Sequence, residues 1–168
     1  MRALENITVL DLTHMLSGPY GTMLMADLGA RTIKIEPPGH GEGTRRLLEN
    51  SLYSRAGMGA YFLTLCRNKE SVALDLKSDA GRELFYGLVR EADVVVSNFA
   101  AGVTTRLKID YAHLSELNPR IITRDRLVVF GGGLPIRKNG VLLGAIGASG
   151  GMEDQDEVCI RAALTAPR

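Results

Sequence analysis

The sequence has no tryptophan, only two cysteines among its 168 residues, and 5% aromatic residues. Cys66 and Cys159 lie too far apart for a CxxC or zinc-binding spacing, and two cysteines do not make a disulfide framework. We therefore expect reduced thiols, as in cytoplasmic proteins, and we expect no metal site.

An excess of charge of one sign is also lacking. Lys and Arg total 20 against 19 for Asp and Glu, which gives a net charge of +1. This balance provides no basic surface for nucleic acid or for an anionic membrane. No apolar run reaches the length of a membrane span, and the opening residues, MRALENITVLDLTH, do not have the pattern of a signal peptide. The sequence thus predicts a cytoplasmic protein with no nucleic-acid or membrane partner.

What the sequence does have is a globular composition, with 45% apolar residues, and a change of character near Thr123. Before Thr123, short β-rich runs alternate with helical patterns, whereas glycine-rich β-like segments follow it. The length allows one ordinary domain or two very small ones. We place a boundary here and expect one part at 1–123 and another at 124–168.

The first part opens with a strand, a helix and a second strand. ITVLDL (7–12) is a short apolar run, and RTIKIE (31–36) alternates as a strand does. Between them, Gly18 and Pro19 open a helical pattern that Gly29 ends. A helix that joins two neighbouring strands makes them parallel.

The same pattern continues to Thr123, so we expect an α/β fold. Its sheet would be open, mostly parallel and Rossmann-like, with helices on both faces, and a C-terminal antiparallel hairpin and helix would extend it. In the helix at 79–92, Leu84, Leu88 and Val89 are expected to face the sheet. The other predicted elements are strands at 71–76, 93–99 and 120–123 and a short helix at 111–118.

Ligands of such sheets bind beyond the carboxyl ends of the strands, which here are the segments after Leu12, Ile35 and Val96. Polar residues and glycines gather in all three segments. Helix amides at Gly18 could meet a phosphate, and Arg45, Arg46 and Arg106 could neutralise one. The chain has neither the GxGxxG fingerprint nor a P-loop, so a nucleotide-like ligand and an ordinary solvated surface stay equally open.

Three blocks of the first part are similar to a known family. GARTIKIEPPGHGEGTR, NKESVALDLK and ADVVVSNFAAG occur in the order seen in class III CoA-transferases, the CaiB/BaiF group that includes formyl-CoA transferases. The resemblance covers residues 2–123. It implies coenzyme A or an acyl-CoA as the ligand, transfer of CoA between a thioester and a carboxylic acid, and a homodimer.

The resemblance also implies which residues contact CoA. Pro37 departs from the family, where a basic residue is frequent at this position. The family's nucleophile is an aspartate in a segment that we do not find here, and the neighbours of Asp125 do not resemble that segment. We therefore predict no catalytic residue and leave open whether the chain is an enzyme. The expected CoA-binding residues are His14, Ser17, Gly18, Glu36, Gly39, Asn68, Lys69, Ser71 and Arg106.

The second part predicts antiparallel strands followed by a helix. Asn139-Gly140 is typical of a two-residue hairpin turn between GLPIRK (133–138) and VLLGAIGAS (141–149). LVVF (127–130) is another β-rich run, and 152–166 has a helical pattern. Residues 127–166 resemble the C-terminal end of the GlcG/HbpS-like family, some members of which bind haem. All the histidines lie in the first part, so no haem site is implied.

Taken together, the two parts predict a truncated CoA-transferase-like protein that binds an acyl-CoA, with a GlcG/HbpS-like end. Two alternatives stay open. One is a non-catalytic binding or structural module, in which the hairpin covers an exposed sheet edge. The other is a fusion remnant without activity. The acyl donor and acceptor do not follow from the sequence.

Overall fold

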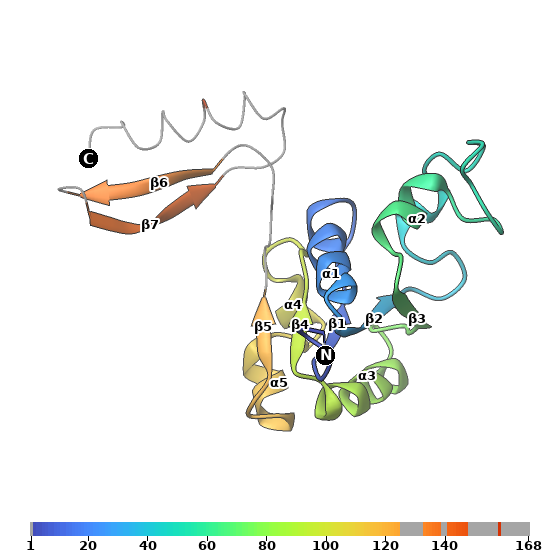
Figure 1. Cartoon of the computed structure of the whole chain (residues 1–168). Coiled ribbons are helices and arrows are strands. Elements are labelled where there is room, and N and C mark those ends of the chain that lie inside the picture. The colour runs from blue at the N-terminus through green and yellow to red at the C-terminus, as the bar shows by residue number, and fades with distance from the viewer. Residues whose placement is uncertain (1, 125–132, 139–140, 148–157, 159–168) are drawn as a thin grey trace. The chain divides into compact units, whose positions relative to one another are not determined.

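The computed structural model describes residues 2–124, 133–138, 141–147 and 158 (Figure 1). The chain divides into two compact units, Met1–Val128 and Val129–Arg168, and each has a sheet of its own. Within the described residues, no helix combines the length and the apolar character that a membrane span requires.

The first unit is built on a five-stranded sheet in which neighbouring strands are parallel, as predicted. The strand order is β3-β2-β1-β4-β5. The chain therefore first adds β2 and β3 on one side of β1 and then adds β4 and β5 on its other side. Open α/β sheets bind ligands where the strand order reverses in this way, which here is between β1 and β4. The strands are β1 (Thr8–Asp11), β2 (Arg31–Glu36), β3 (Lys69–Ala73), β4 (Val94–Val96) and β5 (Ile122–Arg124).

Helices cover both faces of the sheet (Figure 1). Helix α1 packs against β1 and β2, whereas α3 and α5 contribute Phe85, Val89 and Leu114 to the apolar core on the opposite face. Gly29 follows the end of α1 with a φ of 106°, which glycine adopts at little cost. The helices are α1 (Ser17–Asp27), the 3-10 helix η1 (Gly43–Arg46), α2 (Ala60–Leu65), α3 (Asp79–Glu91), α4 (Val103–Arg106) and α5 (Tyr111–Leu117).

The two faces of the sheet differ in chemistry. On one face, Leu10, Ile33 and Ile35 belong to the main apolar core, where a fully buried aliphatic side chain contributes about 1.5–3 kcal/mol. On the other face, their neighbours Asp11 and Lys34 are at most 1% exposed. The alternation in RTIKIE therefore predicts the strand correctly. The polar residues of this strand are buried all the same.

Helix α3 corrects one prediction about which residues face the sheet. Leu84 was expected there but is 63% exposed. Val89 is fully buried, as predicted, and so is Phe85, which the prediction left out, while Leu88 is partly buried against the core. Successive helical residues are turned by about 100°, so Leu84 lies outside the buried face that includes Phe85 and Val89.

Several boundaries in the first unit also differ from the prediction. Strand β3 runs from Lys69 to Ala73 and not from 71 to 76, so the residues after Ala73 form a loop at the carboxyl edge. Helix α1 begins at Ser17, two residues before Pro19. The elements η1, α2 and α4 lie where no helix was predicted.

The second unit contains the predicted antiparallel hairpin. Strands β6 (Gly133–Lys138) and β7 (Val141–Gly147) pair in antiparallel register and form a two-stranded sheet separate from the first. The register shifts between Ile136 and Arg137. The predicted turn at 139–140, the strand at 127–130 and the helix at 152–166 lie outside the described residues, as does Asp125.

Candidate functional site

Three loops meet at the carboxyl edge of the first sheet, as the topology predicts. The loop after β1 is joined to the loop after β4, because the Asn98 side chain accepts a hydrogen bond from the His14 amide and donates one to the His14 carbonyl oxygen, both at 2.8 Å. The loop after β2 joins them through Glu42, whose carboxylate accepts a hydrogen bond of 3.1 Å from the Met15 amide.

A cavity of about 170 Å³ opens at this edge, and we call it the edge cavity. The His14 ring lies against the Phe99 ring with a centroid distance of 5.3 Å, and both line the cavity. The wall is mainly apolar with a few polar groups, which is the usual character of a small-molecule site. It is formed by Leu12, His14, Ile35, Glu36, Pro37, Leu74, Asp75, Leu76, Lys77, Phe99 and Leu107.

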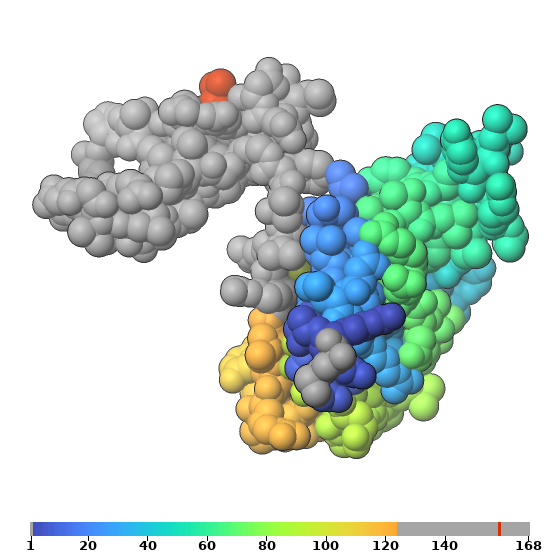
Figure 2. All heavy atoms as spheres, in the orientation of Figure 1, coloured from blue at the N-terminus to red at the C-terminus, as the bar shows by residue number. Residues whose placement is uncertain are grey.

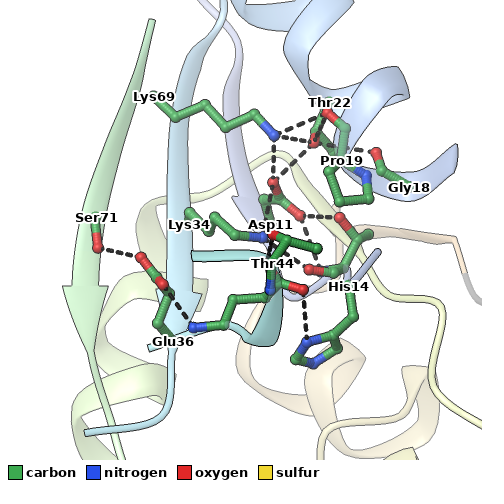
Figure 3. Close-up of polar contacts among 12 residues, drawn as sticks. Asp11, His14, Gly18, Pro19, Thr22, Lys34, Glu36, Thr44, Lys69 and Ser71 are labelled. Atoms are coloured by element: carbon green, nitrogen blue, oxygen red, sulfur yellow. Dashed lines mark hydrogen bonds and ion pairs between the residues drawn. The ribbon is translucent and has the colours of Figure 1, made fainter. Parts of the chain in front are cut away.

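A buried network of charged groups lies on the face of the sheet that α1 covers (Figure 3). The carboxylate of Asp11, which is 0% exposed, accepts hydrogen bonds from Lys69 Nζ and Thr22 Oγ1, both at 2.8 Å. Lys34 Nζ lies 3.9 Å from the same carboxylate and donates to the Thr13 carbonyl oxygen at 2.8 Å. Burial acts to raise the pKa of Asp11, but the two ammonium groups and the hydrogen bonds together lower it. Asp11 is therefore a buried carboxylate anion.

A second part of the network fixes the loop after β2. The Glu36 carboxylate binds Arg45 at 2.6 and 2.7 Å and accepts a hydrogen bond of 2.6 Å from Ser71. The Glu42 carboxylate accepts hydrogen bonds from Thr44 and lies 3.7 Å from His14 Nδ1. Burial acts to raise the pKa of Glu42, yet the neighbouring His14, followed by the hydrogen bonds from Thr44 and the Met15 amide, lowers the pKa to about 2.

The structure separates the expected CoA-binding residues into two groups. His14 lines the edge cavity with a side chain that is 37% exposed, and the exposed Arg106 immediately precedes Leu107 of the same wall. Gly39 lies in the exposed loop after β2, with a φ of 85°. Glu36 also lines the edge cavity, although its carboxylate binds protein groups.

The other expected residues interact within the protein. Ser17 and Gly18 are buried at the start of α1, where a Cβ on Gly18 would lie 2.5 Å from the Thr13 side chain. The Asn68 amide donates to Asp27 at 2.8 Å. Lys69 and Ser71 bind the carboxylates of Asp11 and Glu36 and line a different cavity, under α2.

Sequence reasoning missed most of the residues that form the edge cavity. Leu74 and Leu76 were hidden because the strand was predicted to continue to residue 76, whereas they follow its true end at Ala73. The rule that ligands lie beyond strand ends would have found them with the correct boundary. Within the described residues, no three potential metal ligands come together.

Comparison with known proteins settles the family. The family model described as CoA-transferase family III matches residues 4–141, which reach past the predicted boundary at 123. The chain belongs to this family. The acetyl-CoA:oxalate CoA-transferase of Acetobacter aceti is 47% identical over 122 residues, which are 70% of this chain and 29% of that protein. The succinyl-CoA:mesaconate CoA-transferase of Haloarcula hispanica is 45% identical over 126 residues, 73% of this chain and 31% of that protein.

Solved structures of similar proteins share the fold of this family member. A CAIB/BAIF family protein from Brucella suis superimposes with a TM-score of 0.69 at 35% identity, covering 79% of this chain and 34% of that one. Rv3272 from M. tuberculosis gives a TM-score of 0.67 at 32% identity, covering 74% and 33%. The chain therefore spans about 30% of the length of the relatives that it matches.

Proposed function

We propose that this chain binds coenzyme A or an acyl-CoA at the edge cavity. The observation that carries the proposal is the position of this cavity, at the carboxyl edge of a parallel sheet and beside the reversal between β1 and β4. The names of the relatives support the ligand, because each of them transfers CoA from one acyl group to another acid. The reaction class that we propose is CoA transfer between a thioester and a carboxylic acid.

The chemistry of the wall fits the two ends of the CoA nucleotide. Phe99, Leu74 and Leu76 provide apolar surface on which a flat adenine ring can stack. Lys77 on the wall and Arg106 beside it are exposed cations that suit phosphate groups. A cavity of about 170 Å³ takes only the ring, so the rest of the ligand would lie across the surface of the three loops.

In the proposed reaction an enzyme carboxylate attacks the thioester carbonyl and forms a mixed anhydride as CoA thiolate leaves. The thiolate then attacks the enzyme's carbonyl in this anhydride, which releases the donor acid and leaves an enzyme–CoA thioester. The acceptor carboxylate attacks this thioester in turn, and the returning thiolate forms the acceptor's CoA thioester and frees the enzyme carboxylate. Asp11 does not fit the role of this nucleophile, because it is fully buried and binds Lys69. We propose that this chain supplies CoA binding and that the nucleophile lies outside the matched segment. A non-catalytic module, or a fusion in which 127–166 derives from a GlcG/HbpS-like protein, is the alternative proposal.

Calorimetric titration with CoA and acetyl-CoA tests the binding proposal. We expect Arg106→Ala and Lys77→Ala each to weaken binding about tenfold, with a loss that shrinks as salt increases. Arg90→Ala is the matched control, since Arg90 is an exposed cation near the end of α3, at the amino edge of the sheet. A folded chain that binds neither ligand would exclude the CoA proposal, and equal losses in all three variants would exclude this cavity.

We also propose that the chain forms a homodimer, as the family resemblance implies. The segment between η1 and α2 stands out from the first unit (Figure 2). Its Leu52 and Tyr53 side chains are 90% and 77% exposed, so their apolar surface is not covered by this unit. Light scattering on a size-exclusion column should give twice the monomer mass, and a Leu52→Asp, Tyr53→Asp variant should give the monomer mass.

A further inference from the structure

A second cavity, of about 300 Å³, lies under α2 on the charged face of the sheet, and we call it the sheet-face cavity. In the part of the chain that the structure describes, no residue lines both this cavity and the edge cavity. Its volume is at the lower end of the range for small-molecule sites. The wall is formed by Lys34, Arg45, Met58, Phe62, Leu63, Cys66, Arg67, Lys69, Glu70 and Ser71.

Most of the ion pairs around the sheet-face cavity place their cation, and not their acid, on its wall. Among the described residues of its wall, four are cations and one, Glu70, is an acid, which accepts two hydrogen bonds from Arg31. The carboxylates that pair with the cations, those of Asp11, Glu36 and Asp27, are not part of the wall. The wall therefore favours a negative group. Since every cation already has an acidic neighbour, one negative charge suits the cavity better than two.

Two buried lysines on the wall differ in how many of their three N–H donors are used. Lys69 donates to the Asp11 carboxylate, the Pro19 carbonyl oxygen and Thr22 Oγ1, at 2.8 to 2.9 Å, so its donors are all taken. Lys34 is 1% exposed and, among the described residues, makes one hydrogen bond, while Asp11 lies beyond hydrogen-bond distance at 3.9 Å. Lys34 thus keeps donors for a ligand, and an ammonium with unused donors is costly to bury.

The rest of the wall is suited to an apolar group. The Arg45 guanidinium lies over the Phe62 ring, 4.1 Å from the ring centroid. Met58 and Leu63 lie on the same wall. Burial raises the pKa of the Cys66 thiol to about 11, so at neutral pH the thiol is uncharged and does not compete with an anion. The cavity combines a buried cation with apolar surface.

We propose that the sheet-face cavity binds a small organic carboxylate, with the carboxylate at Lys34 Nζ and the apolar body against Phe62 and Met58. This site is separate from the proposed CoA site and does not depend on it. A second binding site for a singly charged acid thus lies on the opposite side of β2 from the core.

The test uses benzoate as the probe and benzamide as its uncharged counterpart, with the full chain labelled with ¹³C on the methionine methyl groups. Met58→Leu assigns the reporting signal. We expect benzoate to shift the Met58 signal saturably, and benzamide to leave it unchanged at the same concentration. No shift with benzoate, or equal shifts with the two probes, would overturn the proposal.

Two variants connect the shift with the proposed contacts. Lys34→Gln keeps a donor for the Thr13 carbonyl oxygen but loses the charge, and we expect it to weaken benzoate binding at least tenfold, which corresponds to about 1.4 kcal/mol. Leu63→Trp leaves the charged network untouched, fills the cavity and should abolish binding, with circular dichroism showing that the variant is folded. Unchanged affinity in a folded variant, or release of benzoate by CoA, would contradict a separate site at Lys34.

Discussion

The buried pair of Asp11 and Lys69 offers the most direct test of how much the charged network contributes to the free energy of unfolding. Replacing Lys69 with Met removes three hydrogen bonds and leaves the Asp11 carboxylate, which is 0% exposed, with Lys34 at 3.9 Å as its remaining cation. Breaking a buried ion pair by removing one partner costs about 3–5 kcal/mol. Total stabilities of single domains are about 5–15 kcal/mol, so Lys69→Met should remove a large share of the stability.

Urea unfolding at neutral pH, followed by circular dichroism, measures this loss. Glu70→Gln is a matched control on the neighbouring residue of β3, because the Arg31–Glu70 pair has similar distances but side chains that are 61% and 54% exposed. We expect the control to change the unfolding midpoint little, since exposed pairs contribute little. A loss of unfolding free energy below about 1 kcal/mol for Lys69→Met would refute the reasoning, because the buried pair would then contribute no more to stability than an exposed pair does.

Replacing Asp11, Lys34 and Lys69 together tests whether burying these charges costs stability. Asp11→Leu alone leaves two buried ammonium groups, whereas Asp11→Leu, Lys34→Met, Lys69→Met leaves no buried charge of the three. Apolar replacement of a buried charged triad can be neutral or stabilising, whereas removing one member is costly. The triple variant should therefore be more stable than Asp11→Leu, and the opposite order would show that packing and not charge dominates at this site.

Three further predictions concern pH and packing. Burial acts to raise the pKa of Glu42, but His14 and hydrogen bonds from neighbouring groups lower it from 4.5 to about 2. The contribution of the Glu42 carboxylate to stability is therefore complete above pH 4.5 and is lost as pH falls toward 2. Urea unfolding midpoints measured down to about pH 3 should fall less in Glu42→Gln than in the unaltered chain. In α3, Gly81→Ala should destabilise the protein by about 1–3 kcal/mol, because the added Cβ would meet the backbone oxygen of Asp75. Gly87→Ala in the same helix should stabilise it by about 0.5–1 kcal/mol, because the space around Gly87 is open. In thermal or urea unfolding, Phe85→Ala should cost about 3–5 kcal/mol and Leu84→Ala less than about 0.5 kcal/mol; similar losses would contradict the observed face of α3.

The sequence was sufficient for the order and direction of the elements around β1 and β2. Short β-branched runs, a Gly-Pro helix start and a terminal Gly29 are local signals, and local signals determine where strands and helices form. The resemblance identified the family, which the comparisons show. The meeting of His14 with Asn98 also followed in outline, because parallel strands bring their carboxyl ends to one edge.

What the sequence did not reveal depends on contacts between distant residues. Nothing local in RTIKIE shows whether Lys34 meets water or Asp11, since the same alternation describes a half-exposed strand and a strand buried on both faces. Likewise, the end of β3 at Ala73 is set by its pairing with β2, where Glu36 is the last partner, and not by the apolar residues that follow. The edge cavity was incompletely predicted for this reason.

The chemical difference between the two faces of β2 has a consequence for how the strand finds its place. A one-residue slip in pairing turns every side chain of a strand to the opposite face. In β2 such a slip would carry Lys34 and Glu36 into the apolar core and would bring Ile33 and Ile35 against Asp11 and Arg45. Central parallel strands that are apolar throughout have no such safeguard. In β2, misalignment would bury unpaired charge on one side of the sheet and leave the acids of the other side without their partners, so the ion pairs favour the observed alignment over a one-residue slip.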